Sequence, residues 1–160
     1  MFKTLVLESN LEGEKYRQLI NVCFNLSTYF SLTKRDYHIR NSVYKKFSND
    51  VASSYMDTIL TWNWFAYHFY GSEPLEVCLY HANNQMKNVI LRNFDNLYQL
   101  QVSMNGRSRN VKNLPEDLCF FRGDKLLLGT VSHASICFVY PPNEEIANQF
   151  KTLGDWEEVD

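Results

Sequence analysis

The sequence has little of what marks several large classes of protein. It contains six glycines and four prolines in 160 residues, and it holds no glycine-rich phosphate loop, dinucleotide-binding fingerprint or nucleophile elbow. No apolar run approaches the roughly 18 residues of a membrane span, and the first residues lack the apolar stretch of a secretory signal. The sequence therefore predicts a cytoplasmic protein with no membrane partner and no bound cofactor.

Positive charge is also scarce for a protein that binds nucleic acid. The formal net charge is −2, whereas nucleic-acid binders draw much of their affinity from a basic excess. The charge is uneven, because residues 71–160 hold twelve acidic and eight basic residues, and Asp155–Asp160 holds four acids in six positions. This distribution argues against nucleic acid as the main partner.

Metal ligands at recognisable spacings are missing as well. His38, His68 and His81 are far apart in sequence and show no i, i+4 spacing. The cysteines lie among apolar neighbours without zinc-knuckle spacing, so in a cytosolic protein we expect small buried hydrophobic residues. We therefore predict no metal site. The four cysteines are Cys23, Cys78, Cys119 and Cys137.

The N-terminal part predicts a strand and then a helix. Thr4–Glu8 is a short apolar run that suits a buried strand. Ser9 and Glu12 have the spacing of a capping box, and the apolar residues that follow recur at steps of three and four as far as Phe30. Gly13 disfavours the first turn, so the helix is expected to begin at Ser9 or after Gly13.

Two more amphipathic helices are predicted in the middle of the chain. Residues 31–41 are a strand or a connection, and Ser42 caps a helix whose apolar face runs to Ile59. A second helix is expected after Ser72, with an apolar stripe over Leu75–Ile90. Between them, Thr61–Tyr70 favours a central strand, with a buried helix as the alternative.

The C-terminal part predicts an antiparallel meander. Tyr98–Met104 alternates and ends at a hairpin signal, although the residues after it make a poor strand. Three strands, one helix and the intervening turns account for the rest of the chain. We therefore predict one α+β domain over residues 1–160, in which an antiparallel sheet packs against two or three amphipathic helices. The expected elements are strands Leu118–Phe121, Leu126–Ser132 and Ile136–Tyr140 and a helix over Asn143–Leu153.

Catalytic groups are few. Cys119 and His133, oriented by Asp117, form the one candidate pair of nucleophile and base. The apolar neighbours of Cys119 raise the pKa of a thiol and make it inert. Glu116 and Asp117 are neighbours in an extended chain, so we expect them to face opposite sides and not to converge.

Two basic clusters give a further alternative. Residues 34–46 and 107–112 combine Lys and Arg, and the first cluster also contains aromatic residues. Such patches can follow a nucleic-acid backbone if they converge in space. A nucleic-acid or nucleotide-binding module is therefore one alternative, and a small enzyme using Cys119 and His133 is another.

The two ends of the chain resemble a set of small uncharacterised proteins from Bacillus-type Firmicutes. The similarity lies in Leu114–Phe121 (LPEDLCFF), in the LGTVSH run of Leu128–His133, in the strand ending at Tyr140-Pro141, and in the opening LVLESNLEGEKYRQLI. It does not extend over residues 31–113. Proteins of this kind are found beside secreted toxins or within prophages, so the resemblance implies an immunity protein or another small inhibitor.

Our first hypothesis is a non-catalytic protein-binding protein that inhibits another protein, of the toxin-immunity or phage counter-defence type. Concentration of acids on one face would support it, because acidic surfaces associate rapidly with basic partners such as nucleases. The sequence leaves open the identity of the partner, homo-oligomerisation, and whether the aromatic segment 61–70 is core or interface. The predicted contact residues are Trp62, Trp64, Glu116, Asp117, Arg122 and His133.

Overall fold

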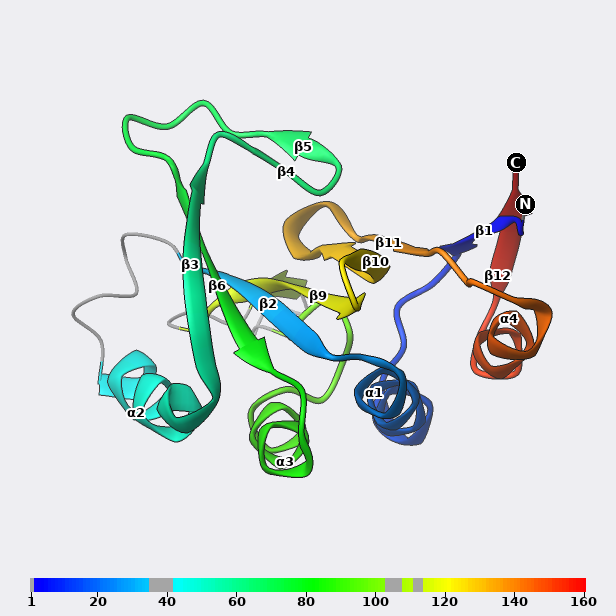
Figure 1. Cartoon of the computed structure of the whole chain (residues 1–160), viewed down its shortest axis with the longest axis horizontal. Helices are drawn as coiled ribbons and strands as arrows, with labels where there is room; N and C mark the ends of the chain where they lie inside the picture. Colours follow the sequence, from blue (N-terminus) through cyan, green and yellow to red (C-terminus); the bar gives the residue numbers. More distant parts are fainter. Residues whose placement is uncertain (1, 35–41, 103–107, 111–113) are drawn as a thin grey trace.

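The computed structural model describes residues 2–34, 42–102, 108–110 and 114–160 and shows an α+β fold. Eight strands form one antiparallel sheet (Figure 1). The predicted C-terminal meander is confirmed at the centre of this sheet, where three consecutive strands are adjacent. In sheet order the strands are β12 (Trp156–Val159), β1 (Thr4–Leu7), β11 (Ile136–Val139), β10 (Lys125–Val131), β9 (Glu116–Arg122), β2 (Tyr29–Lys34), β6 (Leu75–His81) and β3 (Tyr55–Thr61).

Four α-helices lie on one side of the sheet (Figure 1). Phe24 on one helix packs edge-to-face against Phe30 and Phe120 on two adjacent strands, so this interface is the main core. None of the helices in the described part of the chain is long and apolar enough to cross a membrane. The helices are α1 (Gly13–Leu26), α2 (Ser42–Val51), α3 (Asn84–Asn93) and α4 (Glu144–Lys151).

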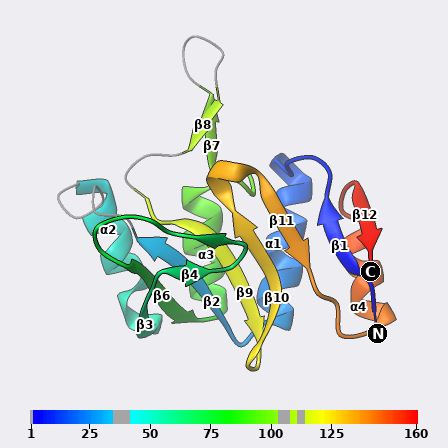
Figure 2. The ribbon, with the colours of Figure 1, turned by 90° about the horizontal axis from the view of Figure 1, so that it is seen from above.

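A short hairpin covers the opposite face of the sheet. Its strands are β4 (Asn63–Trp64) and β5 (Tyr67–His68), and it lies above the centre of the sheet (Figures 1 and 2). The ring of Phe65 sits over Gly129, where any Cβ atom would lie 2.8 Å from the ring. Only glycine permits this approach, so Gly129 lets the hairpin pack closely onto the sheet.

A second hairpin projects beyond the main sheet (Figure 2). It pairs β7 (Leu100–Val102) with β8 (Ser108–Asn110). The sequence predicted the first strand but judged the residues after the turn too poor to form the second, which was wrong. The predicted turn at Asn105-Gly106 lies outside the described residues.

The first helix begins next to the later of its two expected starts. Thr4–Leu7 forms the expected strand, but the helix begins at Gly13, and its N-cap Glu12 makes no side-chain capping bond. The predicted capping box at Ser9 is therefore wrong. Tertiary contacts fix the start instead, because the Leu11 carbonyl accepts a hydrogen bond from Leu97 N at 2.9 Å.

Two predicted helices contain strands. The helix from Ser42 ends at Val51, and the residues from Tyr55 onward form β3. Leu75–His81 forms β6, and α3 begins only after Asn83, whose side chain accepts a hydrogen bond from Met86 N. For the second of these helices, the reason is that β6 pairs with strands on both sides and is apolar on both faces. Its sequence therefore resembles the apolar stripe of a helix.

Thr61–Tyr70 is neither a central strand nor a helix. It forms the β4–β5 hairpin, which turns at Ala66 with φ of 64°. Trp64 and Tyr67 are half-buried against the sheet, whereas Tyr70 is 88% exposed. The aromatic segment is thus partly core and partly surface.

The predicted C-terminal helix is confirmed as α4, and its first turn gives a test of local stability. Asn143 caps the helix by accepting a hydrogen bond from Ile146 N at 2.9 Å. Asn143→Ala should lower the free energy of unfolding by about 1 kcal/mol, because this capping bond is lost. Urea denaturation would measure the change. Asn148→Ala on the exposed side of α4 is the control, and an equal loss there would contradict the capping role.

Candidate functional site

One end of the eight-stranded sheet is strongly acidic. Edge strand β12 pairs with β1, and α4 lies beside them, so the two ends of the chain meet there (Figure 1). This end carries seven exposed carboxylates and two lysines, whereas the rest of the chain has fourteen basic and eleven acidic residues. We call it the acidic end. Its charged residues are Glu8, Glu144, Glu145, Asp155, Glu157, Glu158 and Asp160, with Lys3 and Lys151.

Both lysines of the acidic end are engaged by its own carboxylates. Lys151 Nζ contacts the Glu158 carboxylate, and this hydrogen bond raises the pKa of Lys151 and lowers the pKa of Glu158. Lys3 Nζ lies 3.9 Å from Asp160 Oδ1. The other five carboxylates have no ion pair among the described residues, so the acidic end keeps a large negative excess.

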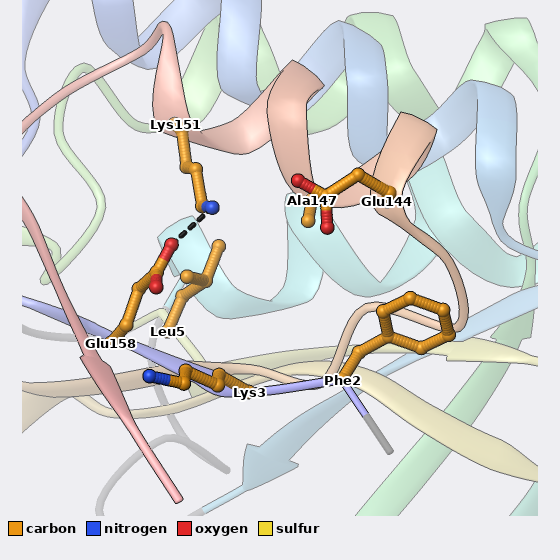
Figure 3. A pocket seen from close by; sticks show the side chains of 7 residues that line it. All are labelled: Phe2, Lys3, Leu5, Glu144, Ala147, Lys151 and Glu158. Atoms are coloured by element: carbon orange, nitrogen blue, oxygen red, sulfur yellow. Dashed lines mark ion pairs between the residues drawn. The ribbon is translucent and has the colours of Figure 1, made fainter.

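A small pocket lies within the acidic end, between α4 and strands β1 and β12 (Figure 3). Its volume is about 230 Å³. Figure 3 shows Lys151 and Glu158 meeting on one side of it, with Phe2 and Glu144 on the other. The buried Leu5 and Ala147 also line it, so the acidic end offers a concave surface with apolar as well as charged atoms.

The structure brings three of the six predicted contact residues together. Glu116, Asp117 and His133 place one ligand atom each within 4.8 Å of one another. Glu116 and Asp117 begin β9, and His133 lies in the short 3-10 turn η3 (Ser132–Ala134) that follows β10. A residue that contacts another protein is expected on the surface. Glu116 is only 7% exposed and Asp117 is fully buried, so neither carboxylate meets this expectation.

A β-bulge explains why the two adjacent carboxylates converge. Ser31 is opposite Cys119 and Thr33 is opposite Glu116, so β9 has one more residue than β2 in this interval. Asp117 has φ of 58°, in the left-handed region, which breaks the alternation of an extended strand. The prediction that Glu116 and Asp117 face opposite sides was therefore wrong.

The Asp117 carboxylate is held by donors on two sides. Its Oδ1 accepts a hydrogen bond from Ser132 N at 2.9 Å, and its Oδ2 accepts one from the Tyr67 hydroxyl at 2.9 Å. The Ser132 hydroxyl accepts from Asp117 N and donates to Gln99 Oε1. Gln99 also has a positive φ, of 55°. Two non-glycine residues with this costly backbone conformation thus meet in one buried network.

The remaining predicted contact residues lie elsewhere. Trp64 packs on Phe121, with ring centroids 6.2 Å apart. Trp62 is 40% exposed and stacks on Phe69. Arg122 is exposed at the other end of β9 from Glu116, so it lies apart from the group formed by Glu116, Asp117 and His133.

Cys119 has the properties of a core residue. It is fully buried, and burial raises the pKa of its thiol to about 12, although Thr130, Ser31 and Trp64 act in the opposite direction. A thiol of this pKa is almost entirely protonated at neutral pH, and a thiol is a poor nucleophile. The geometry gives the Cys119–His133 enzyme hypothesis no support.

The basic clusters can be followed only in part. Lys34 lies 3.5 Å from Glu76 Oε2 and sits over the ring of Tyr44. Residues 35–41, 107 and 111–113 lie outside the described residues, so the expected convergence of the clusters is a prediction that the structure does not address.

The opposite edge of the sheet differs from the acidic end. Edge strand β3 exposes large apolar side chains, and its one charged residue is Asp57. Exposed edges of this kind can accept a strand from another chain. The exposed apolar residues of β3 are Tyr55, Met56, Ile59 and Leu60.

Sequence reasoning found only part of the acidic end. The acids of Asp155–Asp160 were noticed, but Glu8, Glu144 and Glu145 join them through the pairing of β12 with β1 and the position of α4, which no local pattern encodes.

Comparison with protein-family models, curated proteins and solved structures finds no match to this chain.

Proposed function

We propose that this protein is a non-catalytic protein-binding protein whose acidic end holds a basic surface of its partner. The observation that carries this proposal is the concentration of seven exposed carboxylates, against two lysines, at one end of the sheet. Such a concentration supports the protein-binding hypothesis. The negative charge of the acidic end implies that the partner is a protein with an exposed basic face.

The negative charge exceeds what protection of a sheet edge needs. Charged residues on an edge strand prevent unwanted strand pairing, and Glu157 and Glu158 on β12 would suffice for that purpose. Glu8, Glu144 and Glu145 lie off the edge strand and extend the negative surface over neighbouring elements. A surface of this kind steers a basic partner and speeds association.

Inhibition is the mode of action that we favour. A protein that covers the basic face of a nuclease or a similar enzyme blocks access of its polyanionic substrate, without needing a catalytic group of its own. Inhibition is also the class of function that the resemblance predicted from the two chain ends implies.

The test is capture of a partner from the native cytosol by the tagged full chain, compared between two double variants. Asp155→Lys/Glu157→Lys reverses two charges of the acidic end. Asp57→Lys/Glu73→Lys makes the same change in net charge away from it, with Asp57 on the opposite edge strand β3. Circular dichroism would confirm that both variants are folded.

We expect one stoichiometric basic protein that binds the wild type and the Asp57/Glu73 variant but not the Asp155/Glu157 variant. Its association rate should fall as salt is added, since exposed charges are screened over about 8–10 Å at physiological ionic strength. Loss of binding only in the Asp57/Glu73 variant would place the interface at β3 and contradict the proposal. Absence of any partner at low salt would contradict it as well.

A further inference from the structure

We propose that Glu116, Asp117 and His133 bind a divalent transition-metal cation of the zinc type beneath the β4–β5 hairpin. The site lies at the start of β9, in the middle of the sheet, and it is independent of the acidic end. This inference departs from the sequence-based expectation of no metal site, which rested on the spacing of His38, His68 and His81 and on that of the cysteines.

The donor set indicates the class of cation. Two carboxylates and one imidazole, each offering an atom within 4.8 Å of the others, are a combination that suits zinc and related transition metals. Calcium and magnesium prefer sites made of oxygen ligands only. Around a tetrahedral zinc ion with ligand distances of about 2.1 Å, ligand atoms lie about 3.4 Å apart. The exposed His133 must therefore rotate slightly toward the two buried carboxylates.

Groups behind the ligands already hold Asp117 in place. Tyr67 donates to one carboxylate oxygen and Ser132 N to the other, each at 2.9 Å. The rings of Tyr67 and His133 pack edge to face, with their centroids 5.7 Å apart. Metal sites generally orient their ligands through such outer hydrogen bonds, and loss of one typically weakens binding 10–100-fold. Tyr67 is thus a positioning residue for this site.

A second observation points to a ligand at the same place. Thr33 on β2 is directly opposite Glu116, so their side chains project from the same face with Cβ atoms about 5 Å apart. Thr33 is fully buried, and its Oγ1 has no hydrogen-bond partner among the described residues. Buried hydroxyls are nearly always paired. A water molecule on a cation held by Glu116 would supply the missing partner.

The backbone supports the same interpretation. The left-handed Asp117 is what turns its carboxylate toward Glu116, and Gln99, which accepts a hydrogen bond from Ser132, has a left-handed backbone as well. Such conformations cost free energy and persist where the surrounding structure requires them, often at ligand sites. Bulges are also frequent beside such sites.

Isothermal titration calorimetry of the full chain with Zn²⁺ tests the proposal. We expect one ion per chain. His133→Ala should weaken binding at least about tenfold, and because His133 is exposed the variant should fold normally. His81→Ala, which removes another exposed histidine, should leave the affinity unchanged. Tyr67→Phe removes one hydroxyl and should weaken binding about tenfold while keeping one ion per chain.

Substitution with Co²⁺ gives an independent spectroscopic readout. The absorption spectrum should show oxygen and nitrogen ligands without a thiolate charge-transfer band, because the proposed site contains no cysteine. Absence of saturable Zn²⁺ binding would overturn the proposal. So would equal affinity of the wild type and His133→Ala, or a thiolate band that shows the metal bound at a cysteine.

Discussion

Replacement of Phe120 by alanine should lower the free energy of unfolding by about 3–5 kcal/mol, the usual cost of truncating a buried phenylalanine. Phe120 is fully buried on β9. Its ring centroid lies 5.1 Å from that of Phe24 on α1 and 6.1 Å from that of Phe30 on β2. Truncation removes the aromatic contacts that join the first helix to two central strands, and it leaves a cavity that such a packed interface can fill only in part.

Chemical denaturation followed by circular dichroism would measure this loss. Tyr70→Ala is the matched control, because it also removes an aromatic ring, but from a side chain that is 88% exposed. The control should stay within about 0.5 kcal/mol of the wild type. A small effect of Phe120→Ala, or an equal effect of the two variants, would show that the sheet–helix interface is not the main core.

The three-stranded meander and α4 were predictable because their signals are local. Gly123-Asp124 marks the turn between β9 and β10, and Pro141-Pro142 ends the last strand of the meander. In the middle of the chain, the secondary-structure prediction was wrong where a strand is apolar on both faces. In Leu75–His81, burial between β2 and β3 leaves residues at spacings that also fit one face of a helix, so the period alone could not distinguish the two.

The candidate sites depend on contacts that no local pattern records. Glu116 and Asp117 were selected from the sequence as candidate contact residues, and this stays a prediction. Their convergence requires the bulge against β2 and the left-handed backbone of Asp117. His133 reaches them because β10 returns antiparallel to β9 and places η3 at the start of that strand. The acidic end similarly requires that β12 add to β1. Residue types could therefore be chosen from the sequence, whereas their neighbours could not.

Alkaline pH should destabilise the fold steeply. Cys23, Cys119 and Cys137 are fully buried, and burial raises the pKa of each thiol above its ordinary value of 9.0, to about 12 for Cys119. An unfolded chain releases these protons near pH 9, whereas the folded chain retains them. The stability that the thiols contribute is therefore fully present below about pH 9 and is lost as the pH rises toward 12.

The slope of this loss identifies its cause. Each retained proton lowers the free energy of unfolding by about 1.4 kcal/mol per pH unit, so three thiols should contribute a slope of about 4 kcal/mol per pH unit above pH 9. Burial also raises the pKa values of Tyr16, Tyr80 and Tyr98, which add to the slope above about pH 10, so variants are needed to isolate the contribution of the thiols. Urea denaturation at a series of pH values would measure it. Cys119→Ala should reduce the slope by about 1.4 kcal/mol per pH unit, and Cys23→Ala/Cys119→Ala by about twice that amount. A slope unchanged by these substitutions would show that the thiols ionise in the folded protein. In that case Cys119 would be accessible, and a catalytic role for it would have to be reconsidered.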